Sequence, residues 1–270
     1  MNSLTAAGTG PVRITGDTWL IPNSLPAGPE LIVPVNSMVI TGAEPVLIDT
    51  GAPVHRDRWL DAVFSVVEPA DVRWVFLSHD DVDHVGNLEP VLTACPGARI
   101  VASFFMCERM AAAAPLPLSR LRWLEPGESL DIGDRGLHAV LPPLFDSPTT
   151  RGVYDDSTGV LWAADCFASL APGPVHFVEE IPVDLYRETF RSLNSMAAPW
   201  HALVDRGSFR AHADAVEAMG LIAVASAHGP ILTGPEITDG FDRIRALAGA
   251  PIVAPPRQAT LDALVASAMT

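Results

Sequence analysis

Trp74-Val-Phe-Leu-Ser-His-Asp-Asp-Val-Asp-His-Val-Gly-Asn87 is the stretch that decides how this sequence is interpreted. An apolar run ends there in a polar turn, and five potential metal ligands follow within six residues: His79, Asp80, Asp81, Asp83 and His84. Carboxylates packed this closely repel one another and raise each other's pKa unless a cation neutralises them. The stretch therefore predicts a metal-binding turn at the end of a buried strand. A solvated acidic loop that caps the next helix is the alternative that this stretch alone leaves open.

Three more candidate ligands follow apolar runs later in the chain. Asp146 comes after the run 137–141, Asp165 directly follows Val160-Leu-Trp-Ala-Ala164, and His228 follows 221–225. Ligand sites in α/β sheets gather outside the carboxyl ends of strands. A single aspartate at a strand end is more often a turn or a helix cap, so it is the combination with the turn at 79–84 that predicts one shared site.

The pattern His79-x-Asp81-x-Asp83-His84, followed by Asp165 and His228, resembles the metallo-β-lactamase superfamily. The segment Val46-Leu-Ile-Asp-Thr-Gly51 is similar to that superfamily's early strand and turn, where Asp49 supports the metal loop. The resemblance covers residues 15–235. It implies an α/β fold, a four-layer αββα sandwich of metallo-β-lactamase type, with the metals at one edge.

One branch of the superfamily is closer than the others. The common hydrolase motif is HxHxDH, and Asp81 stands where its second His belongs. An acidic residue there is typical of the flavodiiron proteins and related oxygen-binding di-iron proteins, whose motif is HxExDH. The segments Asn36–Ile40 and Asn194–Pro199 are also similar to parts of those proteins. Two residues depart from the family: Asp81 is one methylene shorter than its Glu, and Asp146 stands where it usually has His.

The resemblance implies two metal ions and no catalytic residue beyond their ligands. One ion would take His79, Asp81 and Asp146, the other would take Asp83, His84 and His228, and Asp165 would bridge them. Four aspartates balance two divalent ions. Carboxylate oxygens favour iron or manganese, whereas zinc favours four-coordinate nitrogen and sulfur sites. We therefore expect iron, with zinc or manganese as the alternatives.

The ligand set leaves three functions open. The first is a di-iron oxidoreductase that binds or reduces dioxygen or nitric oxide. The flavodiiron proteins carry a flavodoxin domain after this one, but this sequence ends about forty residues beyond His228 and has no Gly-rich flavin loop. No flavin is therefore expected in this chain, and turnover would need an external electron donor.

The second function is a dinuclear metallohydrolase of an ester, lactone, thioester or phosphodiester, which uses a metal-bridging hydroxide. The anionic charge of Asp81 and Asp146 disfavours it, because that charge weakens the Lewis acidity of the metals. The third is a non-catalytic oxygen sensor or binding module. A full set of candidate ligands favours an enzyme.

Three other residues and one segment receive structural interpretations. Cys166 directly follows Asp165, and strand geometry points its side chain to the opposite face, so we expect a core cysteine. His176 and His201 are expected to be structural or surface residues. The segment 168–184, with three prolines and Glu179-Glu180, is expected to form a rim loop over the metals.

Composition and length indicate the domain organisation, the kinds of partner and the location. The 270 residues, 49% of them hydrophobic, suit one domain over 13–270 after a disordered N-terminus at 1–12. A net charge of −15 argues against nucleic acid and anionic membranes as partners and leaves a small-molecule ligand or substrate. Three cysteines without metal or disulfide spacing, no signal peptide and no membrane-spanning stretch indicate a cytoplasmic location. A homodimer is left open.

Strand-like and helix-like hydrophobic patterns alternate along both halves of the chain, as an α/β fold requires. Strands are expected at 18–22, 31–40, 45–49, 73–77, 99–102, 137–141, 159–163 and 221–225. Helices are expected at 55–67, 87–94, 104–114, 185–196, 208–219, 235–248 and 260–269.

Overall fold

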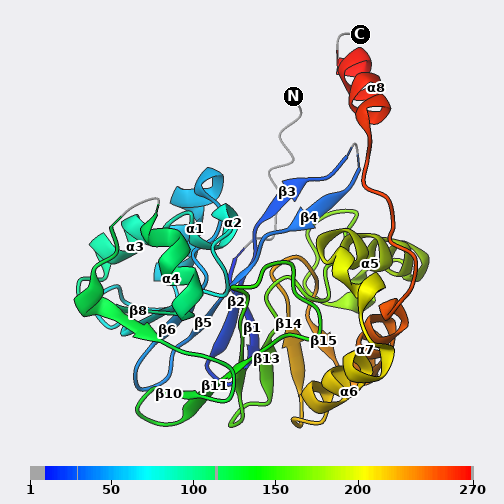
Figure 1. The fold of residues 1–270 in the computed structure, drawn as a ribbon. Coiled ribbons are helices and arrows are strands. Elements are labelled where there is room, and N and C mark those ends of the chain that lie inside the picture. Colours follow the sequence, from blue (N-terminus) through cyan, green and yellow to red (C-terminus); the bar gives the residue numbers. More distant parts are fainter. Residues whose placement is uncertain (1–9, 29, 113–114, 269–270) are drawn as a thin grey trace.

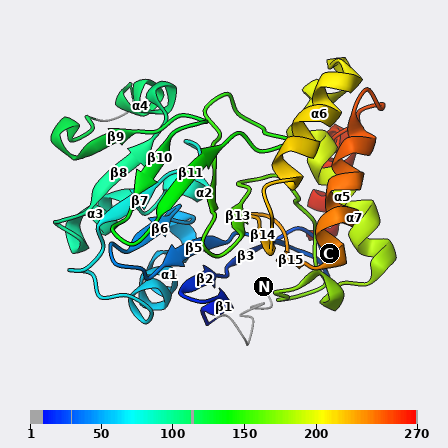
Figure 2. The same ribbon diagram turned by 90° about the horizontal axis from the view of Figure 1, so that it is seen from below.

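Two β-sheets packed face to face form the centre of the molecule, and helices cover both outer faces (Figures 1 and 2). The computed structural model describes residues 10–28, 30–112 and 115–268. Part of the predicted N-terminal segment, residues 1–9, lies outside the described residues, and the first strand begins at Val12.

The first sheet has seven strands in the order β1-β2-β5-β6-β7-β8-β9. They are β1 (Val12–Thr15), β2 (Thr18–Ile21), β5 (Ser37–Ile40), β6 (Val46–Ile48), β7 (Trp74–Phe76), β8 (Arg99–Ala102) and β9 (Leu121–Trp123). From β6 to β9 the strands are parallel, so their carboxyl ends lie at one edge of the sheet. The helices that follow these strands are α1 (Arg56–Phe64), α2 (Val82–Val85), α3 (Leu88–Ala94) and α4 (Phe104–Ala111).

The second sheet has six strands in sequence order from β10 to β15. They are β10 (Ser129–Asp131), β11 (Gly136–Val140), β12 (Gly152–Asp155), β13 (Val160–Trp162), β14 (Ala223–Ala225) and β15 (Leu232–Thr233). Only β13 and β14 are parallel neighbours, because α5 (Val183–Ala197) and α6 (Arg206–Glu217) cross over between them. After β15 come α7 (Pro235–Leu247) and α8 (Gln258–Ala268). Short 3-10 turns occupy Pro53–His55, Leu118–Arg120, Val178–Glu180 and Pro199–Leu203.

Three apolar cores separate the four layers. Alternation along β6 shows the division: Val46 and Ile48 face the core between the sheets, whereas Leu47 faces the core under α1, α3 and α4. Along β13, Trp162 faces the core between the sheets, and Leu161 faces the core under α5, α6 and α7. Both faces of β6 and of β13 are thus buried, as expected for strands between a second sheet and a layer of helices. The predicted four-layer αββα sandwich is confirmed.

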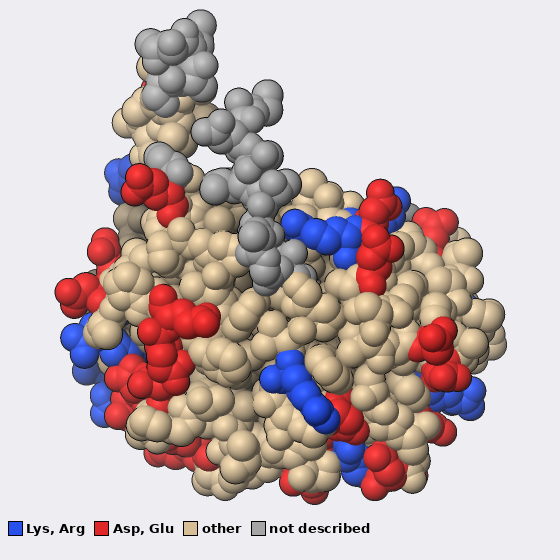
Figure 3. All heavy atoms as spheres, turned by 180° about the vertical axis from the view of Figure 1, so that it is seen from behind, with Lys and Arg blue, Asp and Glu red and all other residues tan. Residues whose placement is uncertain are grey.

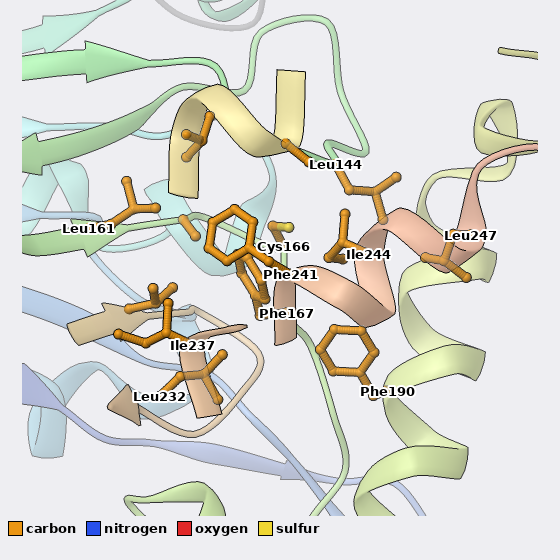
Figure 4. Close-up of a cluster of buried hydrophobic side chains, with 14 of the residues drawn as sticks. Leu144, Leu161, Cys166, Phe167, Phe190, Leu232, Ile237, Phe241, Ile244 and Leu247 are labelled. Carbon is orange, nitrogen blue, oxygen red and sulfur yellow. The ribbon is translucent and has the colours of Figure 1, made fainter. Parts of the chain in front are cut away.

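The core under α5, α6 and α7 holds an aromatic cluster next to the end of β13 (Figure 4). Phe167 packs against Phe241 and Phe190, with ring centroids 5.1 Å and 6.3 Å apart. Cys166 is buried beside them, and burial raises the pKa of its thiol. The prediction of a core cysteine is confirmed.

The predicted strand at 31–40 is two strands, and several short strands were missed. β4 (Ile32–Pro34) pairs with β3 (Ser24–Pro26) in a separate hairpin, while β5 belongs to the first sheet. The chain leaves the ladder between them because the backbone N–H of Asn36 donates to Ala227 O, 2.8 Å away. The missed strands β1, β3, β9, β10, β12 and β15 have two to four residues each, too few for a period to be visible.

The surface gives two further observations. All 17 basic residues are arginines, and Figure 3 shows charged side chains scattered over one largely uncharged face. The β3–β4 hairpin and α8 extend from the same end of the molecule (Figure 1). Within the described ranges, no helix is both long and apolar enough to cross a bilayer.

Candidate metal centre

All seven predicted ligands converge where the carboxyl ends of strands from both sheets meet. His79, Asp81, Asp83 and His84 lie in the turn after β7 and in α2, while Asp146, Asp165 and His228 follow β11, β13 and β14. Because the sheets pack face to face, the turn after β7 lies opposite the three loops of the second sheet. Residues that are up to 149 positions apart (79 to 228) thereby share one site.

The first group of side chains consists of His79, Asp81 and Asp146, whose ligand atoms lie within 4.8 Å of one another. His79 Nε2 is 3.8 Å from Asp81 Oδ2 and 3.6 Å from Asp146 Oδ2. His79 is fully buried, whereas the side chain of Asp81 is 53% exposed. We call this the outer group, because Asp81 opens it to solvent.

The second group, called the inner group, consists of Asp83, His84 and His228, again within 4.8 Å of one another. Asp83 Oδ2 is 3.9 Å from His84 Nε2 and 3.3 Å from His228 Nε2. The side chain of Asp83 is 24% exposed and that of His84 only 1%. This group is therefore more enclosed than the outer one.

Asp165 lies between the two groups. Its Oδ1 is 3.0 Å from His84 Nε2, and its Oδ2 is 3.7 Å from His79 Nε2 and 3.3 Å from His228 Nε2. One carboxylate thus reaches an imidazole of the outer group and both imidazoles of the inner group. This is the position that a bridging carboxylate requires.

Buried polar atoms of the cluster lack partners outside it. Among the described residues, His79 Nε2 has no hydrogen-bond partner, and His84 Nε2 and Asp165 Oδ1, 3.0 Å apart, have no partner other than each other. An unsatisfied buried polar group costs about 1–3 kcal/mol, so a cluster of such atoms needs an explanation. Atoms that share one ion at about 2.1 Å lie about 3–3.5 Å apart, and the separations in the cluster are of that size or slightly larger. Nitrogen and carboxylate donors arranged in this way fit a pair of metal ions.

The three imidazoles are fixed so that each Nε2 faces the cluster. His79 Nδ1 lies 3.1 Å from Ser78 Oγ, and His84 Nδ1 lies 2.9 Å from Asp49 Oδ2. His228 Nδ1 is 2.8 Å from the carbonyl oxygen of Pro34. A carbonyl can only accept, so this Nδ1 carries the proton and leaves the Nε2 lone pair free for a metal.

Asp49 lies beneath the turn that carries four of the ligands. Its Oδ1 accepts from the backbone N–H of Ser78 at 2.7 Å, and its Oδ2 accepts from Ser78 Oγ at 2.7 Å and Trp162 Nε1 at 3.2 Å. Asp49 itself has a left-handed backbone, with φ of 60°. Non-glycine residues keep such a conformation only where the surroundings enforce it, often at functional sites. The expected support of the metal loop by Asp49 agrees with this geometry.

The charges of the cluster shift the pKa values of its members in opposite directions. Burial opposes ionisation of Asp165, but the positive charges of His228 and His84 hold its pKa well below the usual value. Burial likewise opposes ionisation of Asp83, and the hydrogen bond with His228 lowers its pKa to about 2. Burial lowers the pKa of His84 and of His228, yet Asp165 overrides it, raising that of His84 well above normal and that of His228 to about 10.

The pKa of Asp81 shifts in the opposite direction from those of Asp83 and Asp165. Burial raises its pKa, and the neighbouring Asp146 and Asp165 add to that effect, while His79 opposes it. In the metal-free cluster, the raised pKa values of His84 and His228 favour protons on these two imidazoles beside the carboxylates. A pair of divalent cations can take the place of those protons.

Comparison with known families gives one matching family model. The model of the metallo-beta-lactamase superfamily matches residues 32–218, more than half of the chain. The chain belongs to the metallo-beta-lactamase superfamily. The predicted resemblance is therefore confirmed, and the match includes every candidate ligand except His228.

Relatives of this metallo-beta-lactamase domain include flavodiiron and diflavin flavoproteins. It is 24% identical over 205 residues to diflavin flavoprotein A 1 of Synechocystis, covering 73% of this chain and 34% of that protein. It is 24% identical over 201 residues to the flavo-diiron protein FprA2 of Clostridium acetobutylicum, covering 73% of this chain and 49% of that one. The chain thus spans about a third to a half of these curated relatives.

Solved structures of flavodiiron proteins share the fold of this metallo-beta-lactamase domain. Rubredoxin oxygen:oxidoreductase of Desulfovibrio gigas superposes with a TM-score of 0.76 at 18% identity, covering 87% of this chain and 61% of that one. The flavodiiron protein of Giardia intestinalis gives a TM-score of 0.74 at 16% identity, covering 90% and 60%. At these identities the comparison concerns the fold alone.

Asp80 is the acidic residue of the turn that the predicted ligand set leaves out, and its side chain has other partners. Its carboxylate forms an ion pair with Arg109 Nε at 2.7 Å and accepts from Thr149 Oγ1 at 2.8 Å. The adjacent Thr150 Oγ1 donates to Asp146 Oδ1 at 3.0 Å. Asp80 therefore links α4 and the Asp146 loop of this metallo-beta-lactamase domain to the turn after β7.

Two asparagines hold the other ligand loops. Asn36 Nδ2 donates to Ser226 O at 2.9 Å and to Gly229 O at 3.0 Å, on either side of His228. Asn194 accepts from the backbone N–H of Phe167 at 3.0 Å and donates to Ala168 O at 2.9 Å, just after Asp165. The two segments singled out by resemblance, Asn36–Ile40 and Asn194–Pro199, thus begin with residues that position metal-site loops.

The remaining residues of interest lie outside the cluster. His201 is buried and makes hydrogen-bond contacts with Ser195 Oγ at 2.9 Å and Leu247 O at 2.8 Å, so its structural role is confirmed. The expected rim segment 168–184 starts beside the cluster, where Ser169 N–H donates to His228 O at 2.8 Å. Sequence reasoning missed Ser78, Thr150 and the carbonyl of Pro34. Ser78 could have been found, because it directly precedes His79.

Proposed function

We propose that this domain holds two iron ions in the cluster and that the protein binds or reduces dioxygen or nitric oxide with electrons from an external donor. The convergence of three imidazole Nε2 atoms and four carboxylates carries this proposal. Several of these atoms are buried and have no partner outside the cluster among the described residues. The similarity to proteins named as flavodiiron proteins supports iron over other metals.

The proposed ligands follow the two groups. One ion takes the outer group, His79, Asp81 and Asp146, the other takes the inner group, Asp83, His84 and His228, and Asp165 bridges them. Each group draws two ligands from the turn after β7 and one from the second sheet. Carboxylate oxygens make up four of the seven donors, a composition that suits iron or manganese better than a zinc site rich in nitrogen and sulfur.

Bound iron would supply the electrons, one from each ferrous ion, and the protein supplies the surroundings. The side chains of His79 and His84 are enclosed, so these two imidazoles are shielded from water, whereas His228 is 16% exposed. The exposed carboxylate of Asp81 marks the side from which a small diatomic molecule can enter. The hydrogen bonds to Asp49, Ser78 and Pro34 hold the imidazoles in place, so the centre needs little rearrangement when it binds its ligand.

The experiment is ferrous loading of metal-free protein without oxygen, followed by exposure to air or to nitric oxide. We expect two irons per chain by elemental analysis and a new absorption band after air exposure. A His84→Asn variant should bind less iron, whereas Asp61→Asn on the exposed face of α1 should match the unchanged protein. Oxygen consumption with a chemical reductant distinguishes a reductase from a reversible oxygen sensor.

A zinc-containing hydrolase is the outcome that would contradict this proposal. Protein from iron-supplemented cells that contains two zinc ions and negligible iron, and that hydrolyses an ester or lactone, would overturn the di-iron proposal. That result would instead support the dinuclear metallohydrolase.

A further inference from the structure

The inner and outer groups differ in donor chemistry. The inner group offers two imidazoles and one carboxylate of its own, whereas the outer group offers one imidazole and two carboxylates. Imidazole suits iron and zinc, while carboxylates suit manganese and magnesium, and at nitrogen-containing sites Fe²⁺ binds more tightly than Mn²⁺. The two groups therefore do not present the same preference to a metal ion.

The two groups also differ in the kind of contact that holds their side chains. The inner imidazoles are held by a buried carboxylate and a backbone carbonyl, Asp49 for His84 and Pro34 O for His228. In the outer group, hydroxyls make these contacts, Ser78 Oγ with His79 at 3.1 Å and Thr150 Oγ1 with Asp146 at 3.0 Å, and the side chain of Asp81 makes no capping hydrogen bond to α2. Loss of such supporting contacts typically weakens metal binding about 10–100-fold.

The outer group is nevertheless built to receive a ligand. His79 Nε2 is buried, has no hydrogen-bond partner within the described part of the chain and faces both outer carboxylates, at 3.8 Å and 3.6 Å. Its Nδ1 is in contact with Ser78 Oγ at 3.1 Å. The outer carboxylates are therefore more than a solvated acidic patch, because a fixed imidazole nitrogen points at them from the interior.

We propose that the two metal positions are unequal, with an inner position that retains Fe²⁺ and an outer position that exchanges its ion and accepts Mn²⁺ beside it. This inference rests on the proposed dinuclear centre and adds a mixed iron–manganese form to it. The exposed carboxylate of Asp81 gives water and chelators access to the outer ion, while the enclosed His84 protects the inner one.

The test is made on the full chain, freed of metal and kept without oxygen. One equivalent each of Fe²⁺ and Mn²⁺ is added, the protein is desalted, and the retained metals are measured by mass spectrometry and by the electron paramagnetic resonance of Mn²⁺. We expect one iron and one protein-bound manganese. With iron alone, we expect a chelator to remove one of the two equivalents at least about tenfold faster than the other.

An Asp146→His variant assigns the exchanging ion to the outer group. A second imidazole there should abolish manganese retention and slow the loss of the labile equivalent. Asp81→Glu keeps the donor type and should still retain manganese, and Asp61→His on the exposed face of α1 is the control for an added imidazole. The measurements on the unchanged protein decide the matter even if the Asp146 variant does not fold.

The outcomes separate this inference from the proposed function. Two equivalents of iron that leave at the same rate, or retention of the added iron without manganese, would overturn the inference and leave a dinuclear iron centre intact. Failure of metal-replete protein to bind any metal would overturn both.

Discussion

Asp49 Oδ2 lies 2.9 Å from His84 Nδ1, and the same carboxylate accepts hydrogen bonds from the backbone and the hydroxyl of Ser78. A residue from the end of β6 therefore sets both the direction of a proposed ligand and the start of the turn that carries three others. The contact connects the early part of the chain to the candidate metal centre, although Asp49 is not one of the proposed ligands.

Asp49→Asn is expected to weaken metal binding about 10–100-fold, because an amide keeps the shape of the carboxylate but not its charge. Competition with a fluorescent chelator measures this change. Asp155→Asn is the matched control, since Asp155 is an equally buried aspartate whose partners are Arg135 and Ser157. Equal affinities for the two variants would contradict a role of Asp49 in orienting His84.

Asn36→Ala is expected to destabilise the metal-free protein, because the carbonyls of Ser226 and Gly229 lose their donor. Each buried carbonyl left without a partner costs about 1–3 kcal/mol. The free energy of unfolding in denaturant measures the effect. Gln258→Ala removes an exposed contact with Asp262 and should change stability by less than about 0.5 kcal/mol. A similarly small loss for Asn36→Ala would show that the His228 loop does not need this side chain.

Gly86→Ala is expected to disrupt the turn after β7. A Cβ at this position would lie 2.3 Å from Pro53 Cδ and 2.4 Å from Val82 O, and the backbone oxygen cannot move without distorting α2. Such overpacking typically costs about 1–3 kcal/mol, and it would displace His84, two residues away. Thermal unfolding and metal stoichiometry report the two effects. Gly97→Ala, where a Cβ meets nothing within 4 Å, should leave both unchanged.

The metal-free protein is expected to lose stability as the pH rises above 6.5. His228 has a folded pKa of about 10, raised from 6.5, so its stabilising contribution is complete below 6.5 and disappears as the pH approaches 10. Asp83, lowered from 3.8 to about 2, contributes above 3.8 and loses that contribution as the pH falls towards 2. Both contributions are complete between pH 3.8 and pH 6.5, so the metal-free protein should be most stable in that range.

The metal-loaded protein should show the opposite trend above pH 6.5. Metal binding requires deprotonated imidazoles and releases their protons, so the stabilisation by metal increases with pH. Melting temperatures with and without metal, at about pH 6 and about pH 9, should diverge as the pH rises. Parallel curves would argue that His84 and His228 do not bind the ion.

The fold and the convergence of the site could be predicted because each ligand follows a strongly apolar run. The turn at 79–84 follows Trp74–Leu77, and Asp165 follows Val160–Ala164. Such runs identify buried strands, and the carboxyl ends of parallel strands meet at one edge. The resemblance to the flavodiiron proteins then supplied the grouping of the ligands, which the spacing alone does not contain.

Other features could not be predicted because tertiary contacts decide them. The apolar stretch 31–40 has the composition of one strand, but Asn36 bonds to the His228 loop and divides it. β12 is a four-residue strand, too short for a period, and is buried only because it lies between β11 and β13. The Pro34 carbonyl acts through its backbone, so no residue type indicates that it anchors His228.

The proposed ligands come from both halves of the chain, with His79 and His228 separated by 149 positions (79 to 228). Neither half can assemble either trio by itself, since each trio combines two side chains from the turn after β7 with one from the second sheet. Contacts between such distant segments form late, after the entropy of closing a long loop has been overcome. Metal uptake should therefore follow the docking of the two sheets during folding. The bound ions would then cross-link the two sheets and slow their separation.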